Sequence, residues 1–170
     1  PADKPESVEV CFVPNDDYVG VLEQHLPAGA PALTPGPLTT VAGEVIGEHE
    51  GFARYTVGQR RGLPGGFAQP MYVVAIRPER REVVVGPEAA LEGNRLTLAE
   101  VNGLATPLAV GDRCGVQIRY RSRAIPATIT ARSDDGASFL LDTPARAISP
   151  GQSGVLYGAD ERVLGGGVSA

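Results

Sequence analysis

The chain has 170 residues and a mass of 17.7 kDa, which suits one ordinary domain or two small ones. Its 22 glycines and 15 prolines stay below the share, roughly 25–30%, that marks a disordered chain, and 42% hydrophobic residues can build a core. A net charge of −5 argues against a general nucleic-acid binder. All but one of the 15 cationic side chains are arginines, however, and the guanidinium group of arginine is well suited to bind phosphate.

Metal, membrane and export signals are weak or absent. The two cysteines form no Cys-x-x-Cys pair and no Cys/His spacing, so neither a disulfide scaffold nor a metal site is expected. No run approaches the roughly 20 apolar residues of a membrane helix, and no basic start precedes an apolar run. We therefore expect a cytoplasmic protein that binds no metal.

The first 27 residues predict one strand and one short helix. Residues 8–13 alternate as in a strand, with Cys11 on the side away from its apolar face. Asn15 or Asp16 can cap the helix that follows, and Pro27 ends that helix. The thiol of Cys11 thus comes just before a helix start, where the helix dipole can lower its pKa. A half-buried structural cysteine is the alternative.

Residues 28–92 predict a small β-rich domain. A loop rich in proline and glycine leads to a hairpin over residues 38–46. A second hairpin pairs residues 72–76 with residues 82–85, and residues 88–93 then act as a linker. Between the hairpins, glycine-rich segments carry His49, Gln59 and Arg60, and loops of this composition often line a site. The glycines are equally compatible with ordinary turns, and the arginines with surface charge.

Past the linker, short strands follow one another closely. They are predicted over residues 95–101, 113–121, 125–131, 138–141, 154–157 and 163–168. Six such strands, with turn signals about every 8–12 residues, indicate a small antiparallel barrel. The sequence therefore predicts a mainly β protein with a cysteine segment and helix over 1–27, a central β-rich domain over 28–92 and a six-stranded barrel over 93–170.

The predicted strand over 113–121 and its continuation have two different faces. One face consists of Cys114, Val116, Ile118 and Tyr120. The other consists of Arg119, Arg121 and Arg123. Three guanidinium groups in one row predict a phosphate-binding stripe, although a solvated face with paired arginines is the plainer alternative. Cys114, on the apolar face, is expected to be buried and inert.

Several segments resemble the bacterial tRNA-specific 2-thiouridylase family. They are residues 7–14 (SVEVCFVP), 47–51 (GEHEG), 55–63 (YTVGQRRGL), 117–122 (QIRYRS), 149–153 (SPGQS) and 164–167 (LGGG). Their order and spacing hold over essentially the whole chain. The resemblance implies three domains in the complete enzyme: an ATP-pyrophosphatase domain, a small central domain and a C-terminal barrel like those of translation factors. This chain matches the last two.

The resemblance also implies a reaction. The complete enzyme replaces the C2 oxygen of the tRNA wobble uridine with sulfur, in tRNAs for Lys, Glu and Gln. ATP would be bound by the domain that this chain lacks, since the Ser-Gly-Gly-x-Asp-Ser loop is not in the sequence. Cys11 matches the cysteine that carries sulfur as a persulfide, loaded by a sulfur-relay protein or a cysteine desulfurase. The other catalytic cysteine, expected to form a disulfide with Cys11, would also belong to the absent domain.

The family likeness assigns further residues. Arg119, Tyr120 and Gln152 match positions that contact tRNA, which agrees with the arginine stripe. His49, Gln59 and Arg60 match motif positions near the site. A barrel module that binds RNA without chemistry is the competing hypothesis. A tRNA methyltransferase, an older description of the family, lacks support because no glycine-rich nucleotide fingerprint joins a strand to a helix.

Overall fold

A computed structural model describes residues 13, 17–104, 108–120 and 122–170. The chain divides into two compact units, one containing the residues up to Thr56 with Ile76–Val84, the other Val57–Ala75 with Val85–Ala170. Within the described residues, no helix has the length and apolarity needed to span a membrane.

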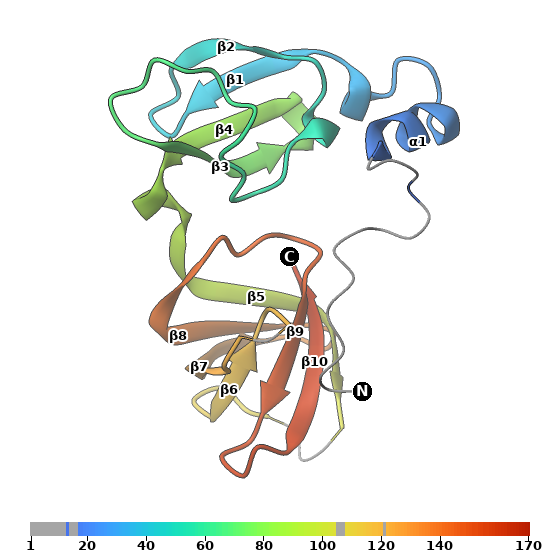
Figure 1. The fold of residues 1–170 in the computed structure, drawn as a ribbon. Helices are drawn as coiled ribbons and strands as arrows, with labels where there is room; N and C mark the ends of the chain where they lie inside the picture. Colours follow the sequence, from blue (N-terminus) through green and yellow to red (C-terminus); the bar gives the residue numbers. More distant parts are fainter. Residues whose placement is uncertain (1–12, 14–16, 105–107, 121) are drawn as a thin grey trace. The chain divides into compact units, whose positions relative to one another are not determined.

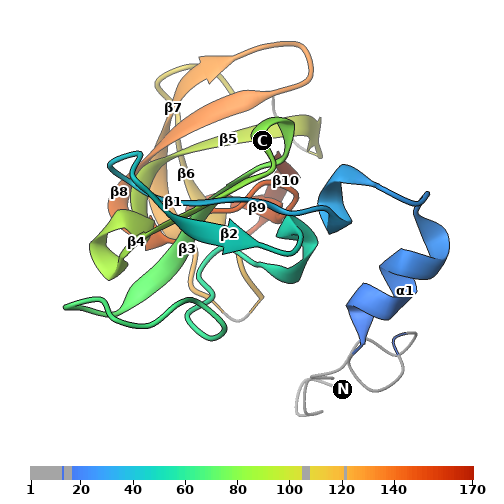
Figure 2. The ribbon, with the colours of Figure 1, turned by 90° about the horizontal axis from the view of Figure 1, so that it is seen from above.

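Helix α1 covers Tyr18–His25 and buries none of its residues; it is the blue coil in Figure 2. Asp17 caps it, because its Oδ1 accepts a hydrogen bond of 2.9 Å from the Gly20 amide. The predicted caps, Asn15 and Asp16, lie outside the described residues, and so does Cys11 with its predicted strand.

A four-stranded sheet carries the two predicted hairpins (Figure 1). Its strands are β1 (Gly36–Thr40), β2 (Val45–His49), β3 (Met71–Arg77) and β4 (Glu82–Pro87), in the spatial order β2-β1-β4-β3. The valine run 83–85 explains why β4 is central, since a short continuous apolar run suits a strand that is buried on both faces. Short 3₁₀ turns flank the strands at Pro31–Leu33, Phe52–Arg54, Pro78–Arg80 and Glu88–Leu91.

The carboxylate of Glu82 ties the central strand to both of its neighbours. Glu82 is only 8% exposed. Thr39, in β1, donates its hydroxyl to Oε1 at 2.7 Å, and Arg77, at the end of β3, donates to Oε2 at 2.9 Å. These two hydrogen bonds lower the pKa of Glu82 below its usual value, outweighing the effect of burial.

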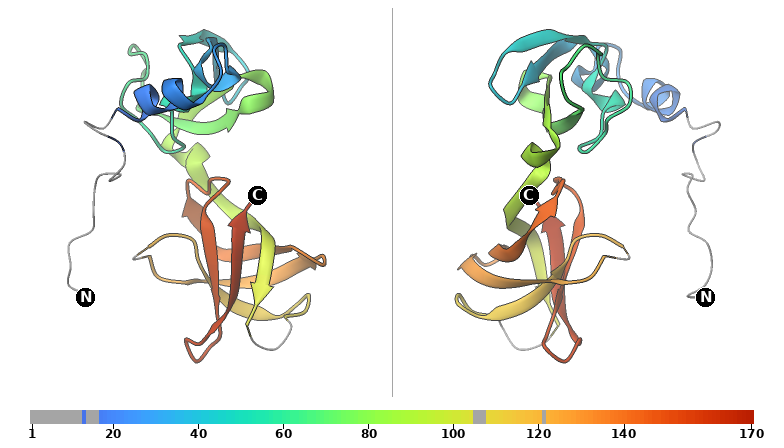
Figure 3. Two further views of the ribbon diagram at one scale, coloured as in Figure 1. Left: turned by 90° about the vertical axis from the view of Figure 1, so that its right-hand side faces the viewer. Right: turned by 60° about the vertical axis from the view of Figure 1, so that its left-hand side comes forward.

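The predicted six-stranded antiparallel barrel is confirmed (Figures 1 and 3). Its strands are β5 (Glu92–Gly103), β6 (Arg113–Gln117), β7 (Ile125–Arg132), β8 (Ala137–Arg146), β9 (Ser153–Tyr157) and β10 (Val163–Ser169). They close in the order β10-β5-β8-β7-β6-β9. Register shifts interrupt the pairings of β5 with β8, β7 with β8, and β10 with β5 and β9. Such bulges increase local twist and bend.

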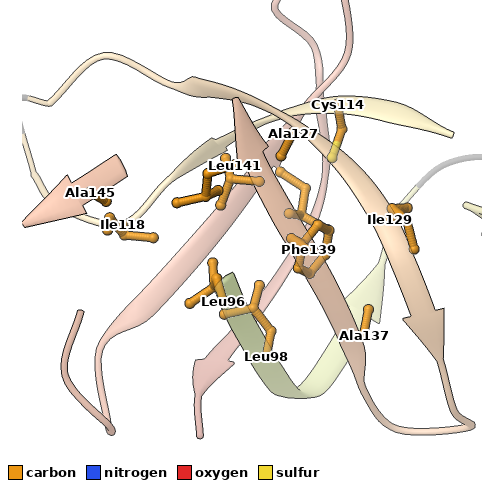
Figure 4. Close-up of a cluster of buried hydrophobic side chains, with 12 residues drawn as sticks. Leu96, Leu98, Cys114, Ile118, Ala127, Ile129, Ala137, Phe139, Leu141 and Ala145 are labelled. Atoms are coloured by element: carbon orange, nitrogen blue, oxygen red, sulfur yellow. The ribbon is translucent and has the colours of Figure 1, made fainter. Parts of the chain in front are cut away.

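One hydrophobic cluster fills the barrel (Figure 4). Phe139 lies among its leucines and is 1% exposed, and Val116 and Ile118 are buried as predicted. Cys114 belongs to the same cluster, and its burial raises the pKa of the thiol. The prediction of an inert cysteine at this position agrees with that environment.

The glycines of β10 let three backbones approach closely. A Cβ atom on Gly167 would lie 2.5 Å from the Ala99 carbonyl oxygen of β5, and one on Gly166 would lie 2.7 Å from the Gly154 oxygen of β9. Real Cβ atoms do not come this near to a backbone oxygen. The Gly-Gly-Gly run therefore has a packing role, allowing β10 to fit between β5 and β9.

One strand prediction is wrong at its end. β6 stops at Gln117 rather than continuing through residue 121. The chain then turns, with the Ser122 amide donating to the Arg119 carbonyl at 3.1 Å. Tyr120, expected on the apolar face, is 77% exposed. The three arginines therefore do not form a row on a single strand.

Candidate RNA-contact surface

The residues predicted to contact tRNA lie on two connections of the barrel. Arg119, Tyr120 and Arg123 are on the loop from β6 to β7, and Gln152 is on the connection from β8 to β9. Arg121 lies outside the described residues. The exposed Arg119, Tyr120 and Arg123 side chains make this loop the more accessible of the two.

Arg119 joins the two connections. Its Nη2 donates to the carbonyl oxygens of Arg146 at 2.9 Å and Ala147 at 3.1 Å. Ala147 has a φ of 52°, a left-handed backbone conformation that an alanine rarely adopts without support. The guanidinium thus stabilises a strained turn that leads toward Gln152.

Gln152 is held by its backbone. Its amide donates to the Ser169 Oγ at 3.0 Å, and its carbonyl accepts from the Ser169 amide at 2.8 Å. Ser169 in turn donates its hydroxyl to the Ser149 carbonyl. The side-chain Oε1 of Gln152 is buried and has no hydrogen-bond partner within the part of the chain that the structure describes. Burying a hydrogen-bond acceptor without a partner costs free energy. A donor group on a ligand that reaches this Oε1 would therefore form a favourable hydrogen bond.

The two serines of this network were not identified from the sequence. Ser149 and Ser169 act through backbone groups of residues far apart in the chain. No spacing of residue types encodes such contacts, so neither serine was assigned a role, although Ser149 lies in the family-like segment over residues 149–153.

His49 lies in the first unit and is 3% exposed. Its Nδ1 accepts from the Gly51 amide at 3.0 Å, so its Nε2 carries the proton and donates to the Arg81 carbonyl at 2.9 Å. The Tyr55 ring centroid lies 5.6 Å from that of the imidazole. Burial, then the charge of Glu50, raises the pKa of the Tyr55 phenol. Both nitrogens of His49 thus hold loops in place.

Gln59 and Arg60 belong to the second unit. The Gln59 Nε2 donates to the Arg61 carbonyl at 2.8 Å, and the Gln59 carbonyl accepts from Val73 of β3 at 2.9 Å. Arg60 is exposed beside an open hollow of about 340 Å³, which is otherwise lined by residues 63–71.

Within the second unit, the segment that carries Gln59 lies near the turn at Ala147 that Arg119 supports. A Cβ atom on Gly58 would lie 3.4 Å from the Ala147 Cβ. The structure thus brings Gln59 into the neighbourhood of the Arg119 contacts. His49 belongs to the other unit and is described separately.

Metal and nucleotide sites have little basis in the described residues. No three His, Cys, Asp or Glu side chains gather there as metal ligands. The one α-helix of the described ranges precedes every strand, so no strand runs through a glycine-rich loop into a helix. That arrangement is what a phosphate-binding loop requires, and the described residues do not supply it.

Two family models match the chain in sequence. Residues 20–87 match the tRNA methyl transferase PRC-barrel domain, and residues 94–168 match the aminomethyltransferase beta-barrel domain. The second match coincides with the closed barrel β5–β10.

Similar proteins are named tRNA-specific 2-thiouridylase MnmA. Those of Cereibacter sphaeroides, Rhodospirillum centenum and Chloroflexus aurantiacus are 43%, 42% and 42% identical, each over 98% of this chain. The chain spans 44%, 43% and 45% of their respective lengths, somewhat less than half. Since this similarity extends over both units, the chain belongs to the family of the tRNA-specific 2-thiouridylases.

Proposed function

We propose that this chain is the sulfur-carrying and tRNA-binding portion of a tRNA 2-thiouridylase that works in the cytoplasm. The observation that carries the proposal is the similarity over 98% of the chain to proteins of that name. The substrate would be the wobble uridine of tRNAs for Lys, Glu and Gln. The reaction would replace the C2 oxygen of that uridine with sulfur.

Cys11 is the residue that we propose to carry the sulfur. Its thiolate attacks the outer sulfur of a persulfide on a sulfur-relay protein or a cysteine desulfurase. The sulfur–sulfur bond of the donor breaks, the donor cysteine leaves as a thiolate, and Cys11 becomes a persulfide. Cys114 is unsuited to this step because its buried thiol has a raised pKa.

ATP would supply the activation of the uridine C2 oxygen in the complete enzyme. The described residues of this chain do not supply a phosphate-binding loop for ATP, so we assign none of them to that step. The disulfide between Cys11 and a second cysteine likewise requires a residue that this sequence does not contain in a suitable place, since Cys114 is buried in the barrel.

The tRNA-contact surface is proposed to include Arg119, Tyr120 and Gln152. The exposed aromatic ring of Tyr120 offers a surface for stacking. The unpartnered Oε1 of Gln152 can accept a hydrogen bond. Arg119 contributes by holding the turn before Gln152 and, with its remaining donors, by contacting phosphate.

Sulfur loading is tested by mass spectrometry. The chain is incubated with a cysteine desulfurase and cysteine, trapped with iodoacetamide and digested. We expect one additional sulfur on the Cys11 peptide and none on the Cys114 peptide, and Cys11→Ser should remove the signal. If Cys11 takes up no sulfur while the chain binds tRNA, the function is that of a non-catalytic RNA-binding barrel instead.

Binding is tested on a tRNA transcript by filter binding across a salt series. Arg119→Ala and Gln152→Ala should each weaken binding about three- to tenfold, a typical loss for one hydrogen-bonding group. Because Arg119 supports the turn before Gln152, the double variant should lose less than the two single losses combined. Arg95→Ala, which removes an exposed arginine of β5, is the control. Binding like wild type by both single variants at every salt concentration contradicts the proposed surface.

A further inference from the structure

A second hollow lies on the barrel beside the loop that carries Arg119 and Tyr120. It is open, has a volume of about 730 Å³, and falls within the usual range of about 300–1,000 Å³ for small-molecule sites. Its walls come from β6, the β6–β7 loop, the end of β9 and the β9–β10 hairpin. The lining residues are Gly115, Gln117, Arg123, Ala124, Tyr157 and Glu161, with Gly158.

Hydrogen bonds hold one wall rigid. The Tyr157 hydroxyl donates to the Gln117 Oε1 at 2.9 Å, and the Gln117 Nε2 donates to the Ser122 carbonyl at 2.7 Å. The phenol ring is thereby fixed against the β6–β7 loop. A preorganised aromatic wall lowers the entropic cost of ordering a ligand against it.

Two charges of opposite sign line the hollow without pairing. Within the described residues, neither the Arg123 guanidinium nor the Glu161 carboxylate has a hydrogen bond or an ion pair. Glu161 has a φ of 61°, and the hairpin keeps it there through its amide, which donates to the Gly158 carbonyl at 3.0 Å. The lining of the hollow thus contains an unpaired cation, an unpaired anion and an aromatic ring.

We propose that this hollow binds one nucleotide of the tRNA, with Arg123 on a phosphate and Glu161 on the ribose 2′-hydroxyl. The proposal rests on the proposed function. A nucleotide carries an anion, hydroxyl donors and a flat base, which match the guanidinium, the carboxylate and the Tyr157 ring. Arg123 and Ala124 of the hollow belong to the same β6–β7 loop as Arg119 and Tyr120.

The Glu161 carboxylate makes the hollow selective for RNA over DNA. A phosphate alone is disfavoured near Glu161 because both groups are anionic. The 2′-hydroxyl of ribose can donate to the carboxylate and offset that repulsion, whereas deoxyribose cannot. Glu161 is thus a specificity-determining residue, and Arg123 is a general phosphate contact.

The test compares a tRNA transcript with a DNA strand of the same sequence, each by filter binding to the full chain. Arg123→Ala should weaken both about tenfold and reduce the log–log salt slope by about 1, the loss expected for one phosphate contact. Glu161→Ala should lower the ratio of RNA to DNA affinity about fivefold. The ratio is the useful quantity because removing a negative charge strengthens binding to both polyanions alike.

Matched controls exist on β5. Arg95→Ala removes an exposed arginine away from the hollow, and Glu100→Ala removes a glutamate with a similar φ of 52°. The proposal is overturned if Arg123→Ala behaves like Arg95→Ala, or if Glu161→Ala changes the ratio no more than Glu100→Ala does. In either case tRNA binding by the wild-type chain would still support the proposed function. Absence of tRNA binding by the wild-type chain would overturn both.

Discussion

The carboxylate of Glu82 shows how one buried charge can bind neighbouring strands together. Thr39 and Arg77 both donate to it, and their hydrogen bonds lower its pKa from the usual 4.5. Because the folded state favours the ionised form, this contribution to stability is fully present above the unfolded pKa. It is lost as the pH falls through the lower folded pKa.

Thr39→Val should therefore destabilise the protein in a pH-dependent way. At pH 7 we expect a loss of about 1–2 kcal/mol, because the ionised carboxylate loses a donor. In acid, below the lowered folded pKa of Glu82, the loss should shrink, since the carboxyl group is then protonated. Urea unfolding at the two pH values measures both. Thr40→Val, on the neighbouring position of β1, is the control, and equal losses for Thr39→Val at both pH values would contradict the role of Glu82.

The backbone contacts of Arg119 were not predictable from the sequence. Its residue type and motif predicted contact with phosphate, but the structure directs one of its nitrogens to two backbone carbonyls. Those carbonyls belong to residues 27 and 28 positions away. Which groups a guanidinium contacts depends on the tertiary structure, so the sequence pattern does not predict them. The same holds for His49, whose acceptor is on Arg81.

At the scale of elements, the close approach of backbones at the glycines of β10 can be tested by substitution. Gly167→Ala should destabilise the barrel by about 1–3 kcal/mol, because its Cβ would come within 2.5 Å of the Ala99 oxygen and 3.0 Å of Val101. Gly103→Ala, at a position with open space on β5, is the matched control and should be close to neutral. Thermal unfolding of both variants measures the difference. Similar melting temperatures would show that β10 can move away from β5.

The elements themselves were largely predictable, because alternation and turn residues are local signals. All six barrel strands and both hairpins were placed, although β8 and β5 extend beyond the predicted bounds. The exception is the end of β6, where alternation continues past Gln117 but the chain turns. A turn without glycine or proline leaves no local mark. The pairing of β1 with β4 is also non-local, and the sequence predicted only the hairpins.

At the scale of the whole molecule, the barrel cluster is separate from the buried residues of the sheet. The cluster contains only residues of the barrel, whereas Leu38, Val73 and Val83 are buried outside it. Cys114 lies inside the cluster and can react with a thiol reagent only when the barrel opens. Its rate of alkylation therefore reports on the stability of the barrel alone.

Phe139→Ala should cost about 3–5 kcal/mol and accelerate alkylation of Cys114, because it leaves a cavity in the barrel core. Val83→Ala removes a fully buried side chain of the sheet and should leave that rate nearly unchanged. Peptide mass spectrometry after timed exposure to iodoacetamide measures both rates. Equal acceleration by the two variants would mean that sheet and barrel unfold as one cooperative unit.

The closure of the barrel also limits which strands of this chain can pair with a second copy of the chain. Strands β5–β10 pair on both sides, and the outer side of β3 is bonded at Val73 by Gly58 and Gln59. Among the described strands, β2 is left at the end of its sheet, with Val45 66% exposed. Exposed edge strands are templates for intermolecular β-pairing, and charged side chains such as Glu48 discourage it. Aggregation of the folded chain should therefore begin at β2.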